Sequence, residues 1–297
     1  VLRCSHLNRA LYELGVSMGN HAQKLAERIL TKGPKHGYCA ICREHGKLTR
    51  EHVPPAGCGN VSNVVLKSLS NIGSKDKRHS VVSQGGLTFG STCHKCNNDR
   101  LGTSYDPELI KLYREMKDLS NSIQSNQLAL PSYKTFFVKP QKIARSVIGH
   151  IIAANSISTL SEPTAHSGIY NDLVEYFKDE DAPLPDNVEI YYWFYPSRDI
   201  KVLKSFGRSF KWGVNPVVGD VLKFFPLAFW VVWNVPEEIN ISLPKLLPNK
   251  KVGGDELTQI TVDFVSHPRL DFPETPDDNG ASLYASQINS VGVQKFV

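Results

Sequence analysis

Apolar residues recur at helical spacing in three stretches of the chain. One stripe runs through residues 7–32 and predicts an N-terminal helix. A second helix is expected to begin at Asp106, whose side chain can cap it, and to end near Leu119. Residues 142–154 are apolar on more than one face, which predicts a third helix that is well buried.

Short stretches rich in β-branched and aromatic residues predict strands in the second half of the chain. The longest apolar run, residues 224–233, contains Pro226 and is typical of a buried strand. Residues 56–90 are rich in Gly, Ser, Asn and Lys, and we expect a long polar loop there. The expected strands cover residues 188–195, 201–206, 221–233 and 257–265. The fold class is therefore α+β.

The chain has 297 residues, enough for two domains or one large one, and its composition is ordinary for a globular protein. No apolar run reaches the roughly 18–20 residues that a membrane-spanning helix needs. The first residues lack the apolar core of a signal peptide. We therefore expect a cytoplasmic protein with no membrane partner.

Charge is distributed unevenly along the chain. Residues 1–150 carry 22 Lys and Arg against 10 Asp and Glu, a net charge of +12. Residues 151–297 carry 12 against 19, a net charge of −7, and the two halves sum to the overall +5. A basic half of this kind favours a polyanionic partner such as nucleic acid, although a basic surface can also serve solubility alone.

Two Cys-x-x-Cys pairs, Cys39 with Cys42 and Cys93 with Cys96, lie in the basic half. Each pair forms a tight turn that directs two sulfurs at one ion, and two such turns complete a closed, tetrahedral structural zinc site. Metal binding is favoured over disulfides because the cysteines cluster in adjacent pairs in a chain without a secretion signal. Three other residues could each replace one cysteine as a ligand: Cys58, His45 and His94.

Between the two pairs lies the run Glu51-His52-Val53-Pro54-Pro55, and directly after the second pair comes Asn97-Asn98-Asp99-Arg100. With the cysteine pairs, these residues resemble the HNH endonucleases, also called ββα-metal or His-Me finger nucleases. The resemblance covers roughly residues 36–104, about a quarter of the chain.

The resemblance implies a treble-clef-like ββα-metal core that hydrolyses phosphodiester bonds in double-stranded DNA. His52 would be the general base, and Glu51 and Asn97 would hold one catalytic divalent ion, Mg²⁺ or Mn²⁺. Arg100 would contact phosphate, and Asn98 competes with Asn97 for the ligand role, although the register favours Asn97. Asn98 is also a candidate substrate contact, and two residues of the polar insertion are candidate DNA-backbone contacts: Lys77 and Arg78.

The chain departs from the family pattern in the long insertion between His52 and Cys93. Three residues of the insertion are candidates for the asparagine that orients the base histidine: Asn60, Asn63 and Asn71. A zinc-ribbon binding module without chemistry and a nuclease that acts on RNA remain alternatives to a DNA endonuclease.

We expect three parts: an N-terminal helical segment over residues 1–35, a nuclease domain with structural zinc over 36–130, and a mixed α+β domain over 131–297. The last part is expected to regulate, to sense a ligand or to bind the target, and a homo-oligomer or a partner protein could assemble through it. A restriction or anti-phage defence role is associated with such nucleases in bacteria.

Overall fold

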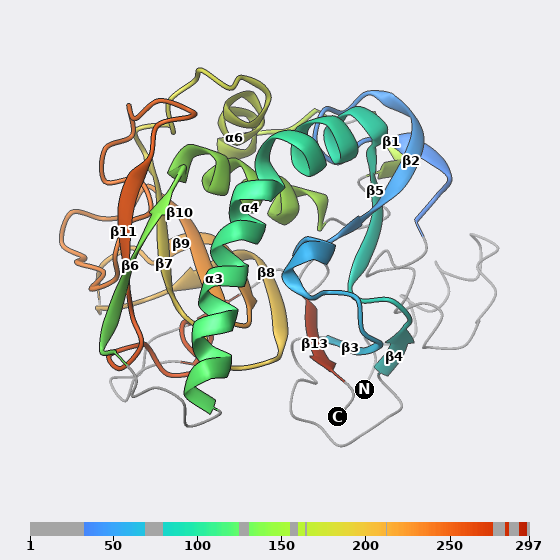
Figure 1. Cartoon of the computed structure of the whole chain (residues 1–297). Helices are drawn as coiled ribbons and strands as arrows, with labels where there is room; N and C mark the ends of the chain where they lie inside the picture. The colour runs from blue at the N-terminus through green and yellow to red at the C-terminus, as the bar shows by residue number, and fades with distance from the viewer. Residues whose placement is uncertain are drawn as a thin grey trace, which may run out of the picture.

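The computed structural model shows a mixed α+β arrangement in which a few helices pack against antiparallel sheets (Figure 1). The described residues are 33–68, 80–124, 131–154, 160–163, 165–211, 213–275, 283–284 and 291–295. The helix expected over residues 7–32 lies outside them. Within them, no helix is long and apolar enough to cross a membrane.

A three-stranded sheet forms the part of the molecule on the right of Figure 1. Its central strand β2 (His45–His52) lies between β1 (His36–Tyr38) and β5 (Thr88–Cys93). A π-helical segment, η4 (Lys95–Tyr105), is separated from β5 by the single residue His94 and leads directly into α3 (Asp106–Gln124). Two antiparallel strands, β2 and β5, are thus followed by a helix. The first cysteine pair precedes β2 in sequence, and the second begins at the last residue of β5.

The expected cap at Asp106 is wrong, although the helix that it was expected to start is present as α3. Because η4 continues into α3, the backbone N–H of Asp106 is already bonded to the carbonyl of Leu101. The Asp106 side chain is buried and accepts a hydrogen bond from Ser146 of the helix α4 (Pro140–Ala153) instead.

An eight-stranded antiparallel sheet contains strands from both sides of the expected domain boundary at residues 130 and 131. The polar insertion supplies two of them, so part of it is strand rather than loop, and the C-terminal strand β13 pairs with both β3 and β8. The division into domains stays a prediction. The strands are β3 (Val64–Ser68), β4 (Ser80–Ser83), β7 (Val188–Phe194), β8 (Ile200–Arg208), β9 (Val217–Phe224), β10 (Leu227–Trp233), β12 (Leu283–Tyr284) and β13 (Val291–Lys295).

The single strand expected over residues 221–233 is wrong, because the stretch forms two strands, β9 and β10, that pair as a hairpin with Phe225 and Pro226 at its turn. Alternate residues of β10 enter two different cores: Phe229 faces the larger one and Trp230 the smaller one. Both faces of the strand are therefore buried, which explains its unbroken apolar sequence.

The buried helix expected over residues 142–154 is confirmed as α4, in which every residue but one is buried. It packs against η4, α3 and α6 (Ile169–Lys178). Arg145 of α4 donates hydrogen bonds to the carbonyls of Tyr176, Asp179 and Ala182 at the end of α6, where helix carbonyls lack partners. These hydrogen bonds satisfy donors of the buried Arg145 guanidinium.

The expected strand over residues 257–265 is confirmed as β11 (Thr258–Asp263), which pairs with β6 (Tyr133–Val138) in a two-stranded sheet. A short 3-10 turn, η1 (Ala56–Cys58), follows β2 and packs against α3. The larger core is one cluster of buried residues that includes Cys39 and Phe264. The helix α4 lies between the three-stranded sheet and the eight-stranded sheet (Figure 1).

Candidate functional site

The structure brings the four cysteines of the two Cys-x-x-Cys pairs together as expected. Cys93 is opposite Leu48 in the β2–β5 pair, so the second turn lies beside the first. All four sulfurs lie within 4.8 Å of one another, and those of Cys42 and Cys93 are 3.7 Å apart. A tetrahedral ion with Zn–S bonds of about 2.3 Å separates its sulfurs by about 3.8 Å. The four free thiols can therefore hold a zinc ion.

Hydrogen bonds among the sulfurs lower the pKa of Cys39 and Cys93, which favours their thiolate form, and raise the pKa of Cys42 and Cys96. The pKa of Cys39 is lowered to about 7, chiefly because the Cys42 thiol hydrogen-bonds to it. The backbone N–H of Cys93 also donates to the sulfur of Cys39, at 3.3 Å. The guanidinium of Arg100 lies 3.9 Å from the Cys96 sulfur, and its expected contact with phosphate stays a prediction.

The alternative zinc ligands are not members of this cluster of four sulfurs. Cys58 is buried beneath α3, and burial raises the pKa of its thiol. His94 is exposed and pairs with Asp99 at 3.6 Å. The ring of His45 packs edge-on against Tyr38.

His52 ends β2 and is half-buried, with one ring nitrogen fixed by the backbone. Its Nε2 lies 3.0 Å from the carbonyl oxygen of Gly85, in the turn before β5. Because a carbonyl only accepts, Nε2 carries the proton. The neutral ring then has its lone pair on Nδ1, which has no hydrogen-bond partner among the described residues. His52 is thus held in the tautomer of a base.

Two of the three candidate asparagines act on the turn that holds His52. Asn60 is buried, donates to the carbonyls of Pro54 and Leu87, and accepts from the N–H of Leu87. Asn63 is exposed and accepts from the N–H of Gly85 at 3.3 Å. Asn71 lies outside the described residues, as do Lys77 and Arg78.

Asn97 lies in the first turn of η4 and joins this helix to β2. Its amide nitrogen donates to Thr49 Oγ1 at 2.8 Å and to the carbonyl of Arg50 at 2.9 Å. With both amide hydrogens used, Oδ1 remains as an acceptor without a partner in the described part of the chain. Oδ1 of the half-exposed Asn97 can therefore bind a hard cation, whereas the neighbouring Asn98 is exposed.

Glu51 does not present its carboxylate beside Asn97 in this way. The side chain is buried, with Oε1 3.6 Å from Nδ1 of His150 on α4. Burial raises the pKa of Glu51 to about 7. Successive residues of a strand point to opposite faces, so Glu51 faces the core where His52 does not. Its expected role as a ligand of an exchangeable, solvent-accessible ion disagrees with this placement.

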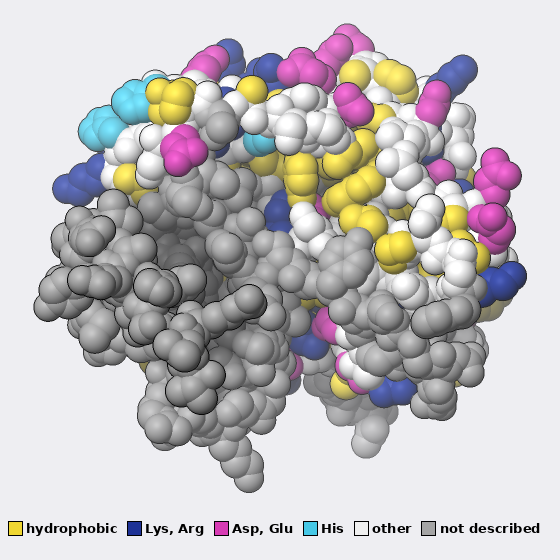
Figure 2. All heavy atoms as spheres, turned by 180° about the vertical axis from the view of Figure 1, so that it is seen from behind, with side chains coloured by type: hydrophobic (Ala, Val, Ile, Leu, Met, Phe, Trp, Pro, Cys, Tyr) yellow, Lys and Arg dark blue, Asp and Glu magenta, His cyan; other side chains and the backbone are white. Residues whose placement is uncertain are grey.

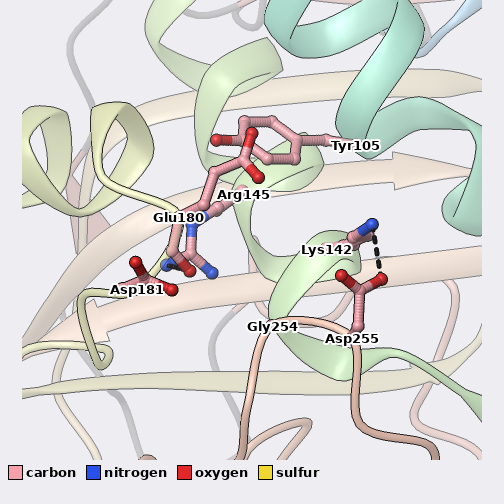
Figure 3. A pocket seen from close by; sticks show the side chains of 7 residues that line it. All are labelled: Tyr105, Lys142, Arg145, Glu180, Asp181, Gly254 and Asp255. Atoms are coloured by element: carbon pink, nitrogen blue, oxygen red, sulfur yellow. Dashed lines mark hydrogen bonds and ion pairs between the residues drawn. The ribbon is translucent and has the colours of Figure 1, made fainter.

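A polar pocket of about 150 Å³ lies between η4, α4 and the loop that contains Asp255 (Figure 3). Its cations already have partners within the protein. Lys142 pairs with Asp255 at 2.7 Å, and Arg145 donates to main-chain carbonyls that include that of Glu180. The pocket therefore has no cation left for an anionic ligand, and we do not assign it a substrate.

Sequence patterns did not predict that His150 and Asp106 would lie near Glu51, because both residues are far along the chain from Glu51 and belong to no motif.

No family model, curated protein or solved structure matches this chain, so any function must be inferred from the geometry of its own residues.

Proposed function

We propose that this chain is an HNH-type, metal-dependent endonuclease that hydrolyses phosphodiester bonds in DNA. One observation supports this above all. The four-cysteine cluster connects the β2–β5 strand pair to η4. Asn97 of η4 donates a hydrogen bond to the carbonyl of Arg50, and Arg50 lies two residues before His52, whose Nδ1 is unprotonated. A base and a hard oxygen donor on one rigid support suit phosphodiester hydrolysis.

In the proposed reaction, Nδ1 of His52 accepts the proton of the attacking water while the Gly85 carbonyl keeps the ring in place through Nε2–H. Oδ1 of Asn97 is the protein ligand that the structure favours for a catalytic Mg²⁺ or Mn²⁺. Such an ion, when bound, stabilises negative charge on the leaving oxygen. Glu51 would reach it only by leaving the core.

The burial of Glu51 favours a second candidate function, a zinc-stabilised module that binds nucleic acid without cutting it. A nuclease of this kind is expected to hold its ion with two protein oxygens, and one of them is turned inward here. The two candidates share the cysteine cluster and differ in whether His52 acts as a base.

Double-stranded DNA as the substrate is supported by the net charge of +12 on residues 1–150. Figure 2 shows that Asp and Glu side chains lie among Lys and Arg over the described part of one face, around a band of hydrophobic side chains. The positive charge is therefore not gathered into one surface on that part of the molecule, and RNA should be tested beside DNA. We extend the proposal to a defence-related role in the cytoplasm, which is supported only by the resemblance to HNH endonucleases.

The test is cleavage of supercoiled plasmid and of RNA by the full chain with Mg²⁺ or Mn²⁺. We expect His52→Ala to lower the cleavage rate about 10²- to 10⁴-fold, because general-base catalysis contributes that much. The matched control is His45→Ala, an exposed histidine of the same strand, which should cut at the wild-type rate. Salt-dependent DNA binding without cleavage by any metal form would instead support the binding module.

A further inference from the structure

Three ionisable side chains from distant parts of the chain meet in the core behind His52. Glu51 comes from the end of β2, Asp106 from the start of α3 and His150 from α4. Their exposed fractions are 5%, 6% and 0%. Each offers one ligand atom, and these atoms all lie within 4.8 Å of one another. Buried groups of this kind carry a large desolvation cost unless their charges are compensated.

Asp106 fixes the protonation of one side of the imidazole. Its Oδ1 accepts a hydrogen bond from Ser146 Oγ at 2.7 Å and lies 2.9 Å from Nε2 of His150. Since an ionised carboxylate only accepts, Nε2 of His150 carries a hydrogen. A neutral imidazole then has its lone pair on Nδ1, on the opposite side of the ring from Asp106.

That lone pair faces a second carboxylate. Nδ1 of His150 is 3.6 Å from Oε1 of Glu51, which is too long for a hydrogen bond. Neither Nδ1 of His150 nor Oε2 of Glu51 has a hydrogen-bond partner within the described structure, and both atoms are shielded from solvent. A lone pair and a carboxylate that face each other in the core repel unless a positive charge, either a proton or a metal ion, lies between them. Burial opposes protonation of His150, but Asp106 and Glu51 raise the pKa of the ring, so a proton on Nδ1 competes with a metal ion for this position.

We propose that a divalent transition-metal ion binds between the carboxylate of Glu51 and Nδ1 of His150, and that Asp106 orients the imidazole through Nε2–H. A histidine ligand whose other nitrogen donates to a carboxylate is the usual arrangement at protein metal sites. The ion balances the two carboxylates, so the buried cluster becomes neutral. Imidazole with carboxylate suits Zn²⁺ or Mn²⁺ better than Mg²⁺, which prefers oxygen ligands and retained water.

This ion is separate from the zinc of the cysteine cluster and from the exchangeable ion proposed at Asn97. It joins Glu51, near the end of β2, to α3 and α4. Because Glu51 directly precedes His52, the ion also fixes the end of the strand that holds the base. The inference does not rest on the proposed function, because the ion would bind whether or not the chain cuts DNA.

Metal counting on the full chain tests the proposal. Protein dialysed against Zn²⁺ and then freed of loosely bound metal should hold two ions per chain, measured by mass spectrometry. Glu51→Gln removes a ligand charge at constant shape and should leave one ion, and Asp106→Asn should weaken the second ion about 10- to 100-fold. The control Asp99→Asn alters an exposed carboxylate beside the cysteine cluster and should keep both.

X-ray absorption at the zinc edge of the wild type tests the same point without a variant. We expect sulfur ligands at about 2.3 Å together with nitrogen or oxygen ligands at about 2.0–2.2 Å. A pure sulfur shell with one ion per chain would overturn the proposal and leave His150 bridged by a proton. A second ion that is lost in Asn97→Ala but kept in Glu51→Gln would also overturn it, because that ion would belong to the His52 site.

Discussion

Replacing Asn60 with alanine should destabilise the fold and disturb His52, although the two side chains share no hydrogen bond in the described structure. Asn60 is 1% exposed and makes three hydrogen bonds to the chain on either side of it, to Pro54 and twice to Leu87. These bonds fix the strand that follows Gly85, whose carbonyl holds the His52 ring. The effect on the base is therefore transmitted through the backbone.

The size of the effect depends on the groups left without partners. Asn60→Ala leaves the Pro54 carbonyl and the Leu87 N–H unsatisfied in the core, at about 1–3 kcal/mol each, whereas the Leu87 carbonyl keeps its bond from the N–H of Val53. Taking the lower figure, we expect a loss of about 2 kcal/mol. At about 2 °C per kcal/mol for a large domain, Tm should fall by about 4 °C. A His52 ring displaced by about 1 Å should cut about 100-fold more slowly.

Thermal unfolding followed by circular dichroism measures the stability loss, and plasmid cleavage measures the catalytic loss. Asn63→Ala is the matched control, because Asn63 is exposed and makes one long bond, to the N–H of Gly85. Its Tm should change by about 1 °C or less. Equal Tm shifts in the two variants would contradict the expected difference, since they would mean that the buried bonds of Asn60 contribute no more than one surface bond.

Three further predictions concern the core and the cysteine cluster. Gly149→Ala would place a Cβ 2.5 Å from the Phe177 ring, so chemical denaturation should show a loss of about 1–3 kcal/mol, whereas Gly46→Ala, which meets nothing within 4 Å, should show little change. Cys96→Ser should lower the zinc content by one ion per chain and lower Tm, and a chelator should do the same to the wild type. Burial lowers the pKa of Lys223 to about 8 from an ordinary 10.5, so between these pH values the unfolded chain binds a proton that the folded chain does not. The free energy of unfolding should therefore rise from pH 8 to 10.5 by about 3 kcal/mol relative to the variant Lys223→Met, as measured by denaturation at each pH.

The elements that depend on local pattern were predicted well. The helices at Asp106 and at residues 142–154 agree with α3 and α4, because their apolar periodicity and their Pro positions act within a few residues. The hairpin of β9 and β10 was predicted as one strand, since a run that is apolar on both faces shows no alternation to mark where the chain reverses.

The site divides in the same way. The spacing of the cysteines predicted that four sulfurs would converge, and the structure places them within reach of one ion. The register after Cys96 favoured Asn97 over Asn98 as a metal ligand, and that choice stays a prediction; the structure adds that the Asn97 amide nitrogen donates to Thr49 and Arg50 of β2. The inward turn of Glu51 could not be predicted, because the sequence does not say that α4 covers that face of β2.

Local sequence pattern was enough to establish the α+β class, the two long helices, the four-cysteine cluster and the position of a histidine between its halves. Each of these depends on residues that are neighbours along the chain or that share one ion. The placement of Glu51 against His150 and Asp106, and the joining of insertion strands to the large sheet, required the folded chain. Those contacts join residues about 40 to 230 positions apart, and burial of apolar surface, which is not directional, brings them together.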